Sequence, residues 1–67
     1  MHALIVDDEP ILVELMETVL AGKGLSSRSA GTVSGGIELL QYGQFDLLVT
    51  DFNLPDGTGA EVIREAK

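Results

Sequence analysis

Three aspartates of this chain stand where they could do chemistry together. Asp7 and Asp8 directly follow the apolar run Ala3–Val6, and Asp51 directly follows a second run, Leu47–Thr50. Open α/β sheets bind ligands at the carboxyl ends of their strands. Because like charges disfavour each other's ionised forms, three carboxylates meeting there need a cation. Mg²⁺ accepts such oxygen ligands and keeps several waters. A carboxylate beside this cation could also attack a phosphoryl group, since the metal neutralises charge on the transferring oxygens.

These acids can meet only if both apolar runs are neighbouring parallel strands. Residues 4–6 and 47–50 are apolar almost throughout, the pattern of strands that are covered on both faces. A third and weaker strand is expected over residues 25–30, where serines favour a position at the edge of the sheet.

Helical patterns lie between the strands. The first helix is expected to begin at Asp8-Glu9-Pro10, with an acid at the N-cap and proline in the first turn, and to end at Gly22 and Gly24. Spacings of one, three and four predict one buried apolar stripe with Val13 outside it. The members of that stripe are Ile11, Leu12, Leu15, Met16, Val19 and Leu20.

Two further helices complete the alternation. Thr32 or Ser34 should cap a helix that ends near Tyr42, and Thr58 a helix from about Gly59 to Lys67. Their expected inner residues are Val33, Ile37, Leu40 and Gln41 in one and Ala60, Val62, Ile63 and Ala66 in the other. The order β-α-β-α-β-α predicts a parallel sheet with right-handed crossovers and helices on both faces.

Composition narrows the class of protein. The 67 residues suffice for one small domain, and the absence of cysteine excludes disulfides and thiolate metal sites and favours a cytoplasmic location. Eleven acids against four bases give a net charge of −7, which argues against direct nucleic-acid binding. No apolar run approaches the ~20 residues of a membrane span.

With these motifs the chain resembles the receiver domain of two-component response regulators. The strand ending in Asp7-Asp8, followed by Glu9-Pro10, matches the acidic pair of that family. The strand ending in Asp51, followed by Leu54-Pro55 and Gly59, matches its phosphoacceptor loop. The resemblance implies a flavodoxin-like three-layer α/β/α fold with parallel strand order 2-1-3, truncated to three β-α units. Residues 1–67 would then form a partial receiver domain.

The resemblance also implies roles for individual residues. Asp51 would accept a phosphoryl group from a histidine kinase or phosphotransfer protein. Asp7, Asp8, Asp51 and the main-chain carbonyl of Asn53 would hold Mg²⁺. Such a domain is a phosphorylated signalling module and not an enzyme. The family has five β-α units, and the Ser or Thr of its fourth strand and the Lys of its fifth have no counterpart here, so we expect impaired activity.

Three other interpretations remain. The outer edge of the strand Leu47–Thr50 would lie bare, which favours a homodimer through this edge and an interaction fragment with an idle acid site. A fragment of a haloacid-dehalogenase-like phosphotransferase would also place an aspartate nucleophile at Asp51, but Asn53 cannot be the second acid of such an enzyme. The acids could also be ordinary helix and strand caps. An EF-hand calcium loop is excluded, because Pro55, Asp56 and Val62 occupy positions that need other residues.

Overall fold

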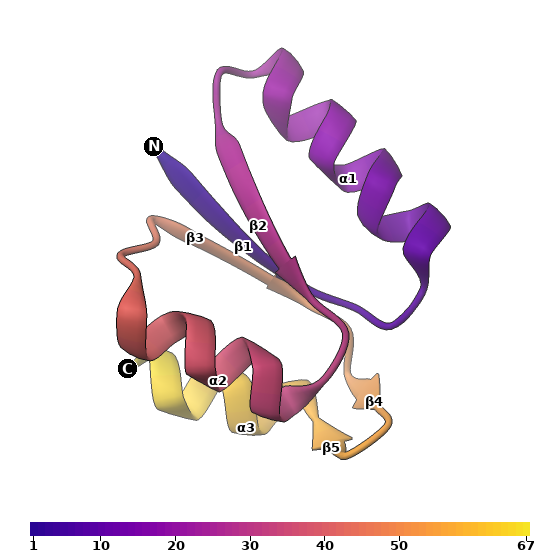
Figure 1. The fold of residues 1–67 in the computed structure, drawn as a ribbon, viewed down its shortest axis with the longest axis vertical. Helices are drawn as coiled ribbons and strands as arrows, with labels where there is room; N and C mark the ends of the chain where they lie inside the picture. Colours follow the sequence, from indigo (N-terminus) through magenta and orange to yellow (C-terminus); the bar gives the residue numbers. More distant parts are fainter.

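Three parallel strands form the central sheet of the computed structural model, which describes all 67 residues (Figure 1). The strand order is β2-β1-β3, as predicted. The strands and helices alternate along the chain as β1 (His2–Val6), α1 (Pro10–Gly22), β2 (Ser26–Ala30), α2 (Val33–Tyr42), β3 (Leu47–Thr50) and α3 (Gly59–Ala66). The loop between β3 and α3 holds a short antiparallel hairpin that was not predicted, formed by β4 (Asn53–Leu54) and β5 (Gly57–Thr58).

The central strand β1 supplies most of the core. Its residues from Ala3 to Val6 are fully buried. Leu4 and Val6 belong to the main apolar cluster with Val33 of α2 and Val62 of α3. Side chains alternate between the two faces of a strand, so Ala3 and Ile5 point to the opposite face, where α1 lies (Figure 1). The sheet is therefore covered by one helix on one face and by two on the other, which is the predicted three-layer arrangement.

The predicted buried stripe of α1 is wrong in part. Leu12, Leu15 and Val19 are 47%, 58% and 50% exposed, and Ile11 is 79% exposed. The residues that face the sheet are Val13, Met16, Glu17 and Leu20, all half-buried. A helix with apolar residues around most of its circumference offers two possible inner faces, and the narrow sheet covers only one of them. The other forms an exposed patch, Ile11, Leu12, Leu15 and Val19, called here the outer face of α1.

Helices α2 and α3 pack side by side on the other face of the sheet (Figure 1). Thr32 caps α2 by accepting a hydrogen bond from the amide of Gly35 at 2.9 Å. In α3, Val62 is fully buried as predicted, whereas the predicted inner residue Ile63 is 44% exposed. Gln41, a predicted inner residue of α2, is exposed as well. Ala60 and Ala66 of α3 are also exposed. Four of the predicted inner residues therefore face outward, because each of these helices buries only a narrow strip.

The two sheet edges differ in chemistry. The edge strand β2 is polar, as its serines predicted, and the opposite edge strand β3 has no partner on its outer side. Leu47 of β3 is 40% exposed. The chain therefore exposes one bare apolar edge, and the outer face of α1 is a second exposed apolar surface. None of the three helices has the length and apolar character needed to cross a membrane.

Candidate functional site

The three predicted aspartates meet at the carboxyl ends of β1 and β3. Asp7, Asp8 and Asp51 each offer a carboxylate oxygen, and these oxygens all lie within 4.8 Å of one another. Asp7 is 7% exposed, whereas Asp8 and Asp51 are exposed to solvent. One carboxylate of the cluster is therefore buried and two face solvent, so that a ligand can reach the cluster without any opening of the fold.

The strand register places these acids. Val6 pairs with Thr50 in the parallel ladder of β1 and β3, so that the next residue of each strand is an aspartate. The ladder continues through both, because the amide of Asp51 donates to the carbonyl of Val6 at 2.8 Å and the amide of Asp7 donates to that of Ala30 at 3.0 Å. The backbone on which the acids stand is thus held by the sheet itself and not by a free loop.

Local hydrogen bonds orient two of the carboxylates. The amide of Glu9 donates to Oδ1 of Asp7 at 2.9 Å, and the amide of Phe52 donates to Oδ1 of Asp51 at 2.8 Å. The predicted acid at the N-cap of α1 is Glu9, but its side chain makes no capping hydrogen bond. The Asp7 carboxylate lies at the start of that helix instead. One oxygen of each carboxylate is fixed in this way, and the other can bind a ligand.

The cluster fits an oxygen-seeking cation. Neighbouring ligand oxygens around an octahedral Mg²⁺ lie roughly 3 to 4 Å apart, given Mg–O distances of about 2.0–2.1 Å. Oxygens within 4.8 Å of one another reach that separation through small side-chain rotations or through a bridging water. The site contains only oxygen donors, which suits a hard cation. Asp7, Asp8 and Asp51 could therefore hold Mg²⁺ directly or through water.

The loop after Asp51 packs tightly beneath it. A Cβ atom on Gly59 would lie 2.3 Å from the carbonyl oxygen of Asp51 and 2.9 Å from Oγ1 of Thr50. The amide of Gly59 donates to the carbonyl of Phe52 at 2.8 Å. Only glycine lets α3 begin so close to the acid. Asn53 lies two residues beyond Asp51 at the start of β4, where it pairs with Thr58 and is exposed.

One long-range contact beside the site was not predicted from the sequence. Asp56, in the turn between β4 and β5, accepts hydrogen bonds from the amides of Val33 at 2.7 Å and Ser34 at 3.0 Å. These two bonds, from Ser34 and then Val33, hold the pKa of the Asp56 carboxyl below its usual value. The contact ties the loop after Asp51 to the first turn of α2. Aspartate is common in turns, so nothing local to Asp56 distinguishes this long-range role.

Sequence comparison assigns this chain to a known family. The sequence pattern of the response regulator receiver domain matches residues 3–67. The chain belongs to the receiver domain family. It is 48% identical over 62 residues to the response regulator protein PilR of Pseudomonas aeruginosa, covering 92% of this chain and 14% of that protein. It is 35% identical over 66 residues to the KDP operon transcriptional regulatory protein KdpE of Escherichia coli, covering 98% of this chain and 29% of that protein.

Solved receiver structures agree with this assignment. The response regulator TrrA of Thermotoga maritima, in complex with Mg²⁺ and BeF, superposes with a TM-score of 0.90 and 31% identity, covering 96% of this chain and 56% of that one. The non-phosphorylated HemR receiver domain of Leptospira biflexa gives a TM-score of 0.84 and 32% identity, covering 94% and 51%. The receiver described here thus spans a small part of its curated relatives and about half of these solved chains. It has the flavodoxin-like fold of the family, of which these residues comprise three β-α units.

Family membership helps to choose among the receiver, haloacid-dehalogenase and capping interpretations of the three acids. A match over residues 3–67 includes both acid-bearing strands and the loop after Asp51, which favours a receiver over a haloacid-dehalogenase-like fragment. Simple capping accounts for the amide held by Asp7 but not for the convergence of three acids. The receiver is a signalling module of two-component systems, and its acid cluster stands at the ligand-binding end of the sheet.

Proposed function

We propose that this receiver accepts a phosphoryl group on Asp51 from a histidine kinase or phosphotransfer protein, with Mg²⁺ held by Asp7, Asp8, Asp51 and the main-chain carbonyl of Asn53. The observation that carries the proposal is the convergence of three carboxylate oxygens within 4.8 Å at the end of β1 and β3. The relative TrrA was solved with Mg²⁺ and BeF, which supports the same ligand class here.

Each residue has a distinct task in this transfer. The free carboxylate oxygen of Asp51 attacks phosphorus, an Asp51 O–P bond forms, and the N–P bond of the donor phosphohistidine breaks, leaving its electron pair on the imidazole nitrogen. The amide of Phe52, bonded to Oδ1 of Asp51, keeps that carboxylate oriented for attack. Asp7 and Asp8 supply ligand oxygens. The bound Mg²⁺ would neutralise charge on the transferring phosphoryl oxygens.

The 67 residues comprise three β-α units, and they hold neither the Ser or Thr nor the Lys that complete a receiver site. Such groups would stabilise charge on the phosphoryl oxygens and report their presence to the rest of the fold. We therefore expect phosphorylation of this chain to be slow and its structural response to be small. These expectations concern the chain by itself.

Phosphorylation is tested with a small phosphodonor, acetyl phosphate, in the presence and absence of Mg²⁺. Intact-mass spectrometry should detect one added phosphoryl group, and peptide mapping should place it on Asp51. Asp51→Asn should abolish the adduct. Glu14→Gln removes an exposed acid from α1 and should leave phosphorylation unchanged. An adduct that persists in Asp51→Asn, or one that never forms with Mg²⁺ in excess, would overturn the proposed role.

A second candidate function is self-association through the outer edge of β3, with the acid site idle. Two observations favour it: β3 has no partner on that side, and Leu47 is 40% exposed there. An unpaired apolar strand edge is a template for pairing with another chain, and a symmetric pair would form a closed homodimer.

Sedimentation velocity over a range of protein concentrations distinguishes these functions. A homodimer should dissociate into folded monomers when Leu47→Lys places a charge on the edge. Leu15→Lys, at an exposed position of α1 away from the β3 edge, is the control for added charge. A wild-type chain that stays monomeric at millimolar concentration would exclude self-association.

A further inference from the structure

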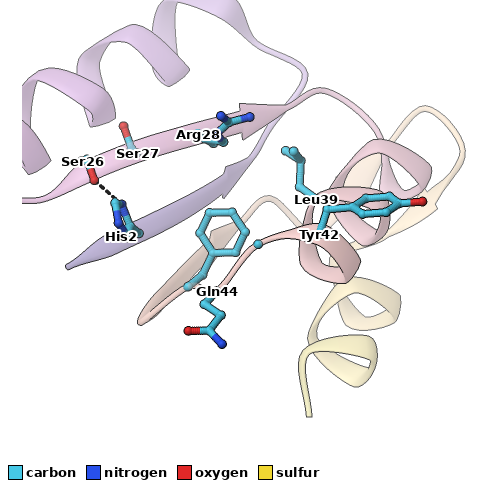
Figure 2. A pocket seen from close by; sticks show the side chains of 9 residues that line it. His2, Ser26, Ser27, Arg28, Leu39, Tyr42 and Gln44 are labelled. Atoms are coloured by element: carbon cyan, nitrogen blue, oxygen red, sulfur yellow. Dashed lines mark hydrogen bonds between the residues drawn. The ribbon is translucent and has the colours of Figure 1, made fainter.

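A hollow lies at the opposite end of the sheet from the acid cluster. It measures about 400 Å³, which is within the size range of small-molecule sites. It is lined by the amino ends of β1 and β2 on one side and by the end of α2 and the following loop on the other (Figure 2).

The charge of this hollow is opposite to that of the chain. The protein carries eleven acidic residues and four Lys or Arg residues, yet no acidic residue lines the hollow, whereas His2 and Arg28 both do. Both side chains come from adjacent strands, because His2 pairs with Ser26 and Leu4 with Arg28 in the parallel register. Strand alternation places Ser26 and Arg28 on the same face of β2. Arg28 is therefore the one formally charged residue of the lining, and just outside the lining the carboxylate of Asp46 accepts a hydrogen bond from the His2 amide at 2.9 Å.

Its geometry favours a ligand with a polar end and an apolar body. The imidazole Nδ1 of His2 is hydrogen-bonded to the hydroxyl of Ser26, which holds the ring at the entrance (Figure 2). Leu39 and Phe45 form the apolar side and pack against the main core. Gly43 lets the Phe45 ring approach the end of α2, since a Cβ there would lie 3.0 Å from its Cε2 atom. Tyr42 lies at the rim, and its ring points away from the hollow (Figure 2).

We propose that this hollow binds a small aromatic anion, with a phosphate or carboxylate group at Arg28 and a planar ring against Phe45 and Leu39. The guanidinium offers paired N–H donors that match such oxyanions, and aromatic side chains stack on planar rings. This site is independent of the proposed phosphorylation of Asp51. The two sites lie at opposite ends of β1 and attract opposite charges.

The site is tested by NMR titration of the labelled protein with phenyl phosphate, benzoate, inorganic phosphate and benzyl alcohol, all without divalent metal. Phenyl phosphate or benzoate should give saturable shifts at His2, Arg28 and Phe45. Inorganic phosphate and benzyl alcohol, which carry only one half of the ligand, should bind more weakly. The tighter of the two aromatic anions identifies the preferred anionic group. A lack of saturable shifts with both would overturn the proposal.

Two variants that each remove one positive charge distinguish specific binding in the hollow from non-specific electrostatic attraction of the anion. Arg28→Gln should weaken binding of phenyl phosphate by about tenfold, the effect of losing a charge-assisted hydrogen bond. Lys23→Gln removes a positive charge outside the hollow and should change the affinity little. Equal weakening by both variants would exclude a specific site. If Arg28→Gln does not fold, Phe45→Leu provides the second test, because it should reduce phenyl phosphate binding towards that of inorganic phosphate.

Discussion

The Oδ1 atom of Asp56 lies 2.7 Å from the amide nitrogen of Val33, 23 residues earlier in the chain. Its second carboxylate oxygen accepts the amide of Ser34 at 3.0 Å. One aspartate from the loop after Asp51 thus satisfies two of the unpaired amides at the start of α2. The contact connects the loop after Asp51 to α2, on the face of the sheet that α2 and α3 cover.

This contact should make stability depend on pH. The pKa of folded Asp56 lies below 3.8, the usual value for an aspartate, because of the backbone hydrogen bonds from Ser34 and Val33. The unfolded chain therefore binds more protons in this range, and stability rises with pH. The contribution of Asp56 is complete above 3.8 and is lost as pH falls through the lower folded value. Thermal melts of wild type and Asp56→Asn between neutral and acid pH should converge at low pH.

The neutral variants of Asp56 separate charge from hydrogen bonding. Asp56→Asn keeps one acceptor for the α2 amides, whereas Asp56→Ala keeps none. Asp56→Ala should therefore have the lower melting temperature at neutral pH. Identical melting temperatures for all three proteins at neutral pH would mean that the two hydrogen bonds do not stabilise the fold in solution.

Gly59→Ala should destabilise the protein by roughly 1–3 kcal/mol, the usual cost of overpacking. The added methyl group would lie 2.3 Å from the carbonyl oxygen of Asp51, so either α3 or the Asp51 backbone must move. Urea unfolding measures this loss. Gly22→Ala is the matched control, because nothing lies within 4 Å of a Cβ at that position. Equal effects of both changes would argue against the tight packing of α3 beneath Asp51.

Mg²⁺ should raise the free energy of unfolding by binding the acid cluster in the folded chain. At a concentration about 100 times the dissociation constant the expected gain is about 2.7 kcal/mol. Asp8→Ala and Asp51→Asn should each raise stability in metal-free buffer, since they relieve repulsion among the three acids. Each should also weaken the effect of Mg²⁺. Thermal melts with and without Mg²⁺ provide the measurement.

The control for this prediction is Glu14→Gln, which removes one acidic charge from the exposed side of α1. It should leave the Mg²⁺ effect intact. Equal destabilisation by Asp8→Ala and Asp51→Asn, with or without metal, would instead identify both acids as caps.

The two sides of α1 should respond differently to the same substitution. Leu20→Ala removes a half-buried side chain and should cost about 1–2 kcal/mol, at or below the lower end of core truncations. Leu15→Ala acts on a residue that is 58% exposed and should change stability by no more than about 0.5 kcal/mol. Urea unfolding at low protein concentration measures both. A large loss in Leu15→Ala would mean that something covers the outer face of α1.

Local sequence patterns determined the elements of this receiver and most of its site. The apolar runs before Asp7 and Asp51 predicted two neighbouring apolar strands, and the serines of residues 26–29 predicted a polar edge strand. Parallel strands that end in acids must bring those acids to one end of the sheet. For that reason the cluster of Asp7, Asp8 and Asp51 followed from the order of the elements, without knowledge of side-chain positions.

The tertiary structure decided which face of α1 is buried and which distant segments meet, two questions that the hydrophobic periodicity left open. Helix α1 has apolar residues around most of its circumference, so its sequence could not say whether Val13 or Leu15 faces the sheet. The position of the helix over β1 and β2 chose Val13. The Asp56–Val33 bond and the hollow lined by His2 and Arg28 join segments that lie far apart in the chain. Such contacts depend on how helices and strands are placed in three dimensions, and no local pattern encodes that placement.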